Sequence, residues 1–433
     1  MKKVFVFILS LLLGFPCLAQ KRVVIADDIR HFWNAYDQIV QTTDSLEQLR
    51  LIDQLYISKG SPGLKSIMEA RRYTREGYVH AINQYPKFWH SIRNNTLKAD
   101  EYAANIEKAI QKLRRLYPGL KPANIYFTIG VLRTGGTTLK NDVLIGSEVA
   151  MADHNTETQE LDAQYAHLRE YFASDPINSL DFLNVHEYIH TQQKTTIGNS
   201  LLAQCLIEGV AEYVAEKALE VKSPNPQIAY GKMNDAKLQS AFAREMFSSD
   251  FGLWLWGAEP DQFGMRDLGY YIGYAISEKY YNKSTDKIAA VREMIQLDYN
   301  NENALFKFVD DSGYFGRPIK SFRDEFENNR PKVVRIEPFE NKSQNVNPST
   351  KTITLHFSKP MNPHSRGFDF GPMGADFVLR VQKINGYSAD RKSFSFDVNL
   401  APGKHYQSVA SERFKDENGY SLQPFLIDFK TSP

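Results

Sequence analysis

The stretch Phe182-Leu-Asn-Val-His-Glu-Tyr-Ile-His190 decides how the chain is interpreted, because it contains the pattern His186-Glu187-x-x-His190. Residues four positions apart on an α-helix lie about one turn apart on the same face, so both imidazoles can bind one metal ion. Glu187 lies beside that face, and its carboxylate can reach a water molecule bound to the metal. Zinc lowers the pKa of such a water to about 7, and a nearby carboxylate can accept its proton. The spacing therefore predicts two metal ligands and a general base.

The residues that flank this motif are typical of an α-helix. Pro176 precedes it, Asn178 can cap its N-terminus, and Asp181 occupies the capping-box position. We expect the helix to end near Thr195-Thr-Ile-Gly198, where β-branched residues and a glycine follow one another. The apolar side of the helix is formed by Leu183, Val185 and Ile189.

A second predicted helix, from Ser200 to Glu216, supplies a third ligand for a zinc ion. Seventeen residues separate His190 from Glu208, which is enough for a helix end, a turn and an antiparallel return. Gly209 allows this helix to approach the first one closely. Glu212 lies one turn beyond Glu208 and can accept the free N–H of a ligand histidine. The alternative is that Glu212 is an ordinary solvated side chain.

The sequences Val185-His-Glu-Tyr-Ile-His190 and Ile207-Glu-Gly-Val-Ala-Glu-Tyr213 together resemble the gluzincin metallopeptidases. In that family H-E-x-x-H is followed by a helix that carries a glutamate ligand, often as Glu-Gly-x-Ala. The gap is about one or two residues shorter here, which keeps Glu212 open as the alternative third ligand. The resemblance implies Glu187 as the catalytic base and Zn²⁺ as the cofactor, with His186, His190 and Glu208 as its ligands.

Residues from about 25 to 320 also resemble bacterial exported proteins described as predicted zinc-dependent proteases, and gliding-motility-associated lipoproteins related to them. The helix expected at Asp267–Tyr281 is similar to the Gly-Tyr-x-x-Gly-Tyr helix of that family. Many gluzincins place a tyrosine or histidine downstream of the motif to donate a hydrogen bond to the oxyanion. Tyr271 and Tyr274 are the candidates here. Core packing is the alternative for each, because the chain contains 23 tyrosines.

The first residues, Met1 to Leu13, are a basic start followed by an apolar run too short to span a bilayer. Small residues before Gln20 predict a signal peptide over residues 1–19, so we expect an exported protein in the periplasm or outside the cell. Phe15-Pro16 does not match the small residues that precede a lipid-modified cysteine, so Cys17 is not expected to carry a lipid. The mature chain then contains one cysteine, Cys205, and cannot form an internal disulfide.

Charge and hydropathy along the chain indicate which kinds of binding partner to expect. The formal net charge of +1 gives no indication of nucleic-acid binding. No later segment is apolar for long enough to cross a membrane. The expected partner is a peptide or protein substrate.

The expected fold class is α+β, divided into three regions after the signal peptide. Residues 20–120 are predicted to form helical hairpins. Residues 121–330 are predicted to form a mostly helical, zincin-like catalytic domain with a small sheet that includes strands at Asn124–Gly130 and Val143–Gly146. The pair Gly135-Gly136 either lets a substrate backbone approach a cleft-edge strand or forms a hairpin turn.

Residues 331–433 alternate apolar and polar side chains with period two, which predicts short strands in a β-sandwich. Phe357-Ser-Lys-Pro-Met-Asn362, with Leu400-Ala-Pro-Gly-Lys-His-Tyr406, resembles the bacterial Ig-like modules of secreted enzymes. This resemblance implies a spacer or a module that docks to the cell envelope.

The sequence therefore predicts an exported zinc metallopeptidase in which Glu187 activates water. The alternative, from another class, is a noncatalytic cell-envelope protein that keeps the fold and binds a peptide, a glycan or a partner. The presence of Glu187 favours the enzyme, because a metal scaffold does not need that carboxylate.

Overall fold

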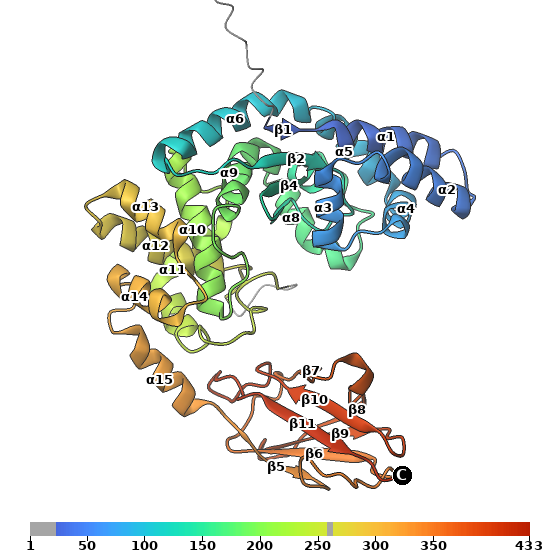
Figure 1. Cartoon of the computed structure of the whole chain (residues 1–433), viewed down its shortest axis with the longest axis vertical. Helices are drawn as coiled ribbons and strands as arrows, with labels where there is room; N and C mark the ends of the chain where they lie inside the picture. The colour runs from blue at the N-terminus through green and yellow to red at the C-terminus, as the bar shows by residue number, and fades with distance from the viewer. Residues whose placement is uncertain (1–22, 258–262) are drawn as a thin grey trace, which may run out of the picture.

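The computed structural model describes residues 23–257 and 263–433 and has an α+β fold. In Figure 1 the helices form an arc, and the strands near the C-terminus form a separate unit at its lower end. The described residues form two hydrophobic cores: the larger draws buried residues from Val24 to Phe326, and the smaller from Ile336 to Phe429. The N-terminal helices thus share one core with the helices that carry the predicted metal ligands.

Within the described residues, no helix is both long enough and apolar enough to cross a bilayer. The predicted signal peptide at residues 1–19, with Cys17, lies outside the described residues.

The N-terminal helices begin where side chains accept backbone N–H groups. Asp44, Ser61 and Thr74 cap α2 (Ser45–Ile52), α3 (Pro62–Arg71) and α4 (Arg75–Gln84) in this way. The aromatic residues Trp33 and Trp89 are buried among these helices. The bounds are α1 (Asp27–Ile39), α2 (Ser45–Ile52), α3 (Pro62–Arg71), α4 (Arg75–Gln84), α5 (Pro86–Thr96) and α6 (Ala99–Leu116).

A four-stranded sheet lies next to these helices, in the order β1-β2-β4-β3. Strands β1 (Val24–Ile25), β2 (Asn124–Thr128) and β4 (Asp142–Gly146) are parallel, and β3 (Gly136–Leu139) is the antiparallel edge strand. The two strands that the sequence predicts correspond to β2 and β4. The glycine pair does not form the hairpin turn, because Gly136 is the first residue of β3 and the turn follows Leu139.

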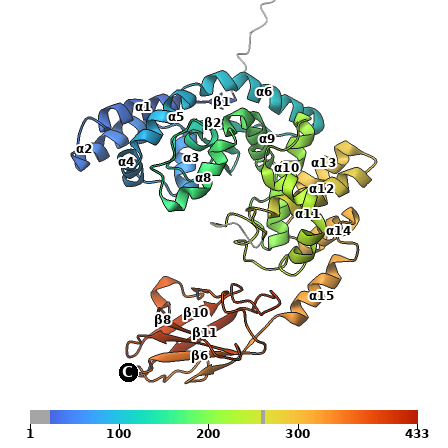
Figure 2. The same cartoon turned by 180° about the vertical axis from the view of Figure 1, so that it is seen from behind.

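Helix α9 (Leu180–His190) lies between this sheet and α10 (Leu201–Leu219), and α6 packs against both helices (Figures 1 and 2). Asn178 does not cap α9, because it lies in a 3₁₀ turn at Pro176–Ser179. The helix ends at His190, earlier than the sequence predicts. Ser200 caps α10 as expected, with its Oγ accepting the N–H of Ala203.

Helix α12 (Gly269–Lys283) packs against α10 through glycines. A Cβ atom on Gly209 would lie 2.1 Å from the carbonyl carbon of Gly273, and one on Gly273 would lie 1.8 Å from the carbonyl oxygen of Cys205. Gly209 therefore allows close approach to α12 and not to α9, which corrects the expectation from the sequence.

The described residues contain six further α-helices. They are α7 (Ser147–Ala150), α8 (Ala166–Ala173), α11 (Pro226–Phe242), α13 (Lys287–Gln296), α14 (Glu302–Ser312) and α15 (Ile319–Asn329).

After α15, residues 333–430 form the C-terminal β unit, which has two antiparallel sheets around the smaller core. One sheet has the order β5-β6-β9-β8 and the other has the order β11-β10-β7. Alternate residues of β6 are buried, as its period-two pattern predicts. The strands are β5 (Val333–Glu337), β6 (Thr352–Phe357), β7 (Phe368–Phe370), β8 (Val381–Tyr387), β9 (Ser393–Val398), β10 (His405–Ala410) and β11 (Phe425–Lys430).

One fully buried carboxylate holds the loop between β2 and β3. Glu148 accepts the backbone N–H of Gly130 at 2.8 Å and that of Leu132 at 3.0 Å. Burial raises the pKa of Glu148 from 4.5 to about 7, and these two N–H groups only partly offset the burial. The groups that interact with it electrostatically include the phenols of Tyr56, Tyr73 and Tyr78.

We predict that Glu148 makes the folded state less stable as the pH rises from 5 to 8. The folded state binds its proton more tightly than the unfolded chain does, so this contribution is full below pH 4.5 and is lost as the pH passes 7. The expected change is about 2 kcal/mol. Urea unfolding of wild type and Glu148→Gln across this range measures it as the difference between the two proteins. A difference that does not vary with pH would contradict the prediction.

Candidate metal centre

Helices α9 and α10 bring three predicted ligands together. His186 Nε2 lies 3.1 Å from His190 Nε2, and both nitrogens face Oε2 of Glu208, at 3.5 and 3.3 Å. All three residues are buried, each less than 8% exposed. They form a group that can hold a metal ion. Glu208, rather than Glu212, faces the two Nε2 atoms.

Glu212 occupies the position behind His186 instead. Its Oε2 lies 3.1 Å from His186 Nδ1, which makes that nitrogen the N–H donor. The other oxygen of Glu212 accepts hydrogen bonds from Ser223 Oγ and, at 2.9 Å, from Asn225 Nδ2. Glu212 is fully buried, so it is not a solvated side chain. A carboxylate in this position fixes the tautomer and the ring orientation of a ligand histidine.

His190 is oriented by Gln193, which the sequence pattern did not indicate. The Gln193 side chain donates from Nε2 to the carbonyl oxygen of Ile207 at 2.9 Å and to the hydroxyl of Tyr299 at 3.2 Å. Its Oε1 therefore faces His190 Nδ1, at 2.7 Å, and accepts the N–H of that ring. These contacts also explain why α9 ends at His190, because the chain turns there to bring Gln193 back over the ring.

The donor set fits a cation. With both Nδ1 atoms donating, each neutral imidazole presents an Nε2 lone pair to the other and to the carboxylate of Glu208. The three donor atoms are separated by 3.1, 3.3 and 3.5 Å. A tetrahedral zinc ion with bonds of about 2.0–2.1 Å separates its ligand atoms by about 3.3 Å. The spacing of the donors is therefore that of one face of a tetrahedral zinc site.

Without a cation, the cluster must hold a proton. Burial alone would lower the pKa of His186, but hydrogen bonds to Glu208 and Glu212 outweigh burial and raise this pKa to about 10. Burial alone would raise the pKa of Glu208, but His190 and His186 hold it well below its usual value. The buried carboxylate thus requires positive charge at this point, which a metal ion also supplies.

Glu187 lies on the sheet side of the cluster, beside the start of the edge strand. A Cβ atom on Gly136 would lie 2.7 Å from Glu187 Oε1, so any larger residue at the start of β3 would displace this carboxylate. Burial raises the pKa of Glu187, and the charges of His190 and His186 partly offset this effect. The glycine at position 136 therefore allows the start of β3 to lie close to the Glu187 carboxylate. Gly136 is part of the candidate site for this reason.

Tyr270 of α12 contacts the cluster. Its ring is stacked on that of His186, with the ring centroids 6.1 Å apart and an angle of 28° between the planes. The two predicted tyrosines are not brought to the cluster, because Tyr271 donates to Asp235 and Tyr274 donates to Glu216. The sequence pattern locates the helix but does not determine its rotation about its axis.

An aromatic segment, Phe251–Trp256, forms a wall beside Tyr270. Trp256 donates from Nε1 to the Tyr270 hydroxyl at 3.4 Å, and Trp256 as a whole is 54% exposed. Because the hydroxyl accepts this bond, its own proton is available to another acceptor. A left-handed backbone at Trp256 (φ of 59°) is held by the bond from its N–H to Asp267.

No protein-family model matches the sequence, and no curated protein is significantly similar to it. Three solved structures of the S-layer protein SbsC match with a TM-score of 0.18. The crystal structure of rSbsC(31-844) is 11% identical over 94% of this chain and 45% of that protein. The structure of SbsC domains 1–6 is 13% identical over 94% and 46%. The chain spans about half of these two proteins, and a TM-score this low does not establish a shared fold.

We predict that the purified protein binds about one zinc ion per chain and that His186→Ala abolishes this binding. Gln193→Ala should weaken zinc affinity about 10–100-fold, because His190 loses the acceptor that fixes its tautomer. The matched control is Gln192→Ala, since Gln192 bonds to Lys121 and not to a ligand. Metal analysis and competition with a chelator measure both effects. Equal affinities of the two glutamine variants would contradict the role of Gln193.

Proposed function

We propose that this protein is an exported zinc-dependent peptidase. The observation that carries the proposal is the triangle of donor atoms from His186, His190 and Glu208, with Glu187 beside it. A structural zinc site is closed by four protein ligands, whereas a catalytic site keeps a position for water. Three donors that share one face of a tetrahedron, with a carboxylate adjacent, support a catalytic site.

A bound zinc ion would polarise a peptide carbonyl and acidify water at the site. The carboxylate of Glu187 accepts the proton of the attacking water and delivers it to the leaving amine. Burial removes bulk water from Glu187 and so strengthens its electrostatic interaction with the reacting groups. Glu212 and Gln193 hold the two imidazoles in the orientation that this chemistry needs.

The edge strand suggests how a peptide binds. Strand β3 is last in its sheet, and within the described residues no strand pairs with its outer edge. An extended peptide can pair with such an edge through backbone hydrogen bonds, largely independently of its sequence. Because Gly136 in β3 lies against Glu187, a peptide on this edge would pass the general base. This arrangement favours peptides over other acyl substrates.

The finer parts of the proposal follow from the sequence resemblances. We propose a zincin-like catalytic domain and an Ig-like fold for the C-terminal β unit. Export to the periplasm or the cell exterior rests on the predicted signal peptide. Docking of the β unit to the cell envelope is likewise proposed from the resemblance alone.

We predict that Glu187→Gln binds zinc as wild type does but loses peptide turnover by about 10²–10⁴-fold, because the amide cannot accept the proton. Cleavage of a proteome-derived peptide library, read by mass spectrometry, measures the loss whatever the sequence preference of the enzyme. Asp181→Asn, an exposed change on the same helix, is the control. Zinc-loaded wild type that cleaves none of these peptides would favour the noncatalytic binding protein.

We also predict that Tyr270→Phe lowers kcat about 10²–10³-fold, because the ring beside His186 carries the hydroxyl that can stabilise the oxyanion. Tyr271→Phe and Tyr274→Phe should change kcat little. Each loses a partly buried hydrogen bond, to Asp235 or Glu216, and should lower the free energy of unfolding by about 1–3 kcal/mol. Kinetics and urea unfolding of the three variants separate these effects. A larger loss of kcat in Tyr271→Phe or Tyr274→Phe than in Tyr270→Phe would contradict this assignment.

A further inference from the structure

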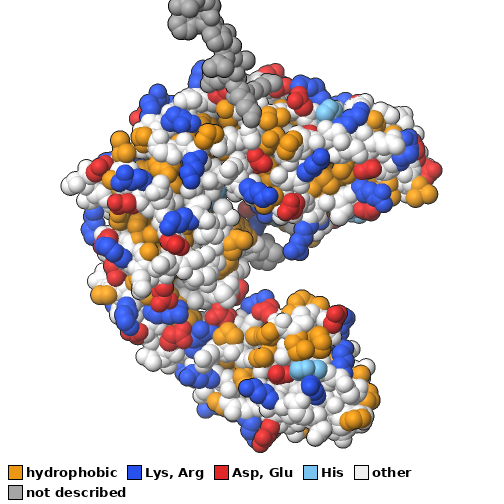
Figure 3. Space-filling model, in the orientation of Figure 1, with side chains coloured by type: hydrophobic (Ala, Val, Ile, Leu, Met, Phe, Trp, Pro, Cys, Tyr) orange, Lys and Arg blue, Asp and Glu red, His pale blue; other side chains and the backbone are white. Residues whose placement is uncertain are grey.

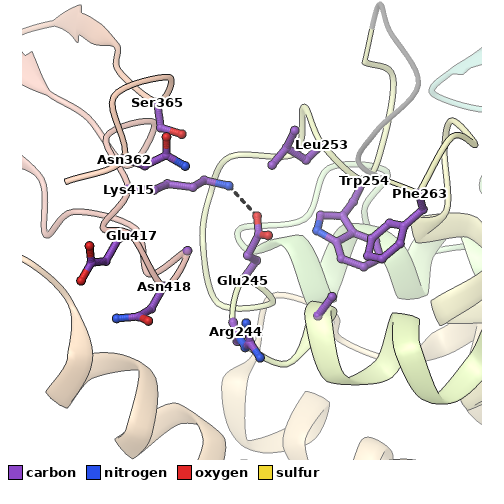
Figure 4. Close-up of a pocket in the computed structure, with 12 residues that line it drawn as sticks. Arg244, Glu245, Leu253, Trp254, Phe263, Asn362, Ser365, Lys415, Glu417 and Asn418 are labelled. Carbon is purple, nitrogen blue, oxygen red and sulfur yellow. Dashed lines mark hydrogen bonds and ion pairs between the residues drawn. The ribbon is translucent and has the colours of Figure 1, made fainter. Parts of the chain in front are cut away.

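The C-terminal β unit is joined to the helical part by buried ion pairs. Lys415 Nζ lies 2.5 Å from Glu245 Oε2, and these side chains are 8% and 10% exposed. Figure 4 shows this pair bridging the two parts. Arg330, at the end of α15, donates to Glu412 at 2.6 Å. A buried charge is costly when it loses its partner, so these pairs fix the contact.

Glu412 reaches further into the helical part. Its Oε2 accepts the backbone N–H of Ser249 at 2.5 Å and the hydroxyls of Ser249 and Ser248 at 2.6 and 3.2 Å. The turn from Glu245 to Ser249 is therefore held by the β unit at both ends.

This turn is bonded to the start of α10, the helix that carries Glu208. The backbone N–H groups of Leu201 and Leu202 donate to the carbonyl oxygens of Ser248 and Met246, each at 2.8 Å. The first N–H groups of a helix have no acceptor within the helix itself. The carbonyl oxygens of the Glu245–Ser249 turn therefore supply the missing acceptors at the N-terminus of α10.

The aromatic wall, Phe251–Trp256, follows the same turn closely in the chain. Trp254 is 1% exposed, and its carbonyl oxygen accepts the N–H of Gly269 at the start of α12. Two residues later, Trp256 bonds to Tyr270, which is stacked on His186. A continuous set of contacts thus runs from Glu412 and Lys415 to the ring beside the candidate ligand.

Apolar packing fills only part of this junction, where Tyr420 of the β unit packs against the helical core. A cavity of about 370 Å³ lies between the β unit and the helical part. Its lining includes Leu253, Trp254 and Phe263 on one side and Asn362, Glu417 and Lys415 on the other (Figure 4). The space-filling view shows that the molecule is also hollowed between the N-terminal helices and the β unit (Figure 3). The two parts therefore meet through the buried ion pairs together with the packing of Tyr420, and the cavity separates them elsewhere.

We propose that the β unit is a positioning element of the catalytic site. Glu412 and Lys415 hold the turn from Glu245 to Ser249, and this turn places the start of α10 and the wall that contacts Tyr270. This role goes beyond a spacer or an envelope-docking module. Its catalytic consequence rests on the proposed peptidase function, but the positioning itself does not.

Amide hydrogen exchange of the full-length protein tests the positioning. Lys415→Met and Glu412→Ala should accelerate exchange at least tenfold at the N–H groups of Leu201, Leu202, Trp256 and Gly269. Strands β2 and β4 should exchange as in wild type, which shows that the variants are folded. The control is Asp428→Asn, which breaks a pair with His405 inside the β unit and should leave these amides unchanged.

A charge exchange gives the rescue. Glu245→Lys combined with Lys415→Glu restores the pair in reverse and should return exchange to within threefold of wild type. Unchanged exchange at these amides in Lys415→Met and Glu412→Ala would overturn the proposal. Acceleration throughout the helical part, β2 and β4 included, would also overturn it, because the pairs would then support only global stability.

Turnover of the peptide library supplies the catalytic readout. Lys415→Met should lower kcat about tenfold, with KM and zinc affinity within threefold of wild type, because it disturbs the wall and the first turn of α10 but not Glu208, which lies further along that helix. If wild type binds no zinc or cleaves no peptide, the proposed function fails while the exchange results still decide the positioning. Normal kcat in a variant with accelerated exchange would overturn the catalytic part alone.

Discussion

The interaction on which this structure depends is the meeting of two imidazole nitrogens and one carboxylate in a buried space between α9 and α10. Buried polar groups are tolerated only when partners surround them. Here the partners come from every direction: Glu212 behind His186, Gln193 behind His190, and Gln204 beside Glu208. The outer partners are in turn bonded to Ser223, Asn225 and Tyr299. The hydrogen bonds of the polar cluster therefore fix the positions of the loops that precede and follow α10.

The second requirement of this arrangement is glycine at the positions where two backbone segments, or a backbone and a side chain, lie close together. The carboxylate of Glu187 fits under the edge strand because Gly136 has no Cβ atom, and α10 approaches α12 because Gly209 and Gly273 have none. Gly231 likewise leaves space for the ring of Tyr271. The protein thus places its polar groups by bringing backbone segments closer than ordinary side chains permit.

Local signals in the sequence were sufficient to predict the two ligand helices, because ligand spacing depends on neighbouring residues, as does the cap that Ser200 forms on α10. The cap predicted for α9 was wrong, since Asn178 lies in a 3₁₀ turn before that helix. The position of the end of α9 was not predictable in this way. It depends on Ile207 and Tyr299, which lie 14 and 106 residues from Gln193. Tyr270 was missed for a related reason. Which face of α12 meets His186 is set by the contact between Gly273 and Cys205, and periodicity alone does not contain that information.

The contact between Gly209 and Gly273 has a consequence for how distant relatives can be recognised. Neither position accepts even a methyl group without moving the backbone of the other helix. A substitution at one glycine cannot be compensated at the other, because each faces main-chain atoms and not a side chain that could shrink. The two positions must therefore vary together with the helix spacing or not at all. A search pattern can therefore require H-E-x-x-H, then Glu-Gly, then a glycine in a later helix. Such a pattern excludes chains that contain the short motif by chance.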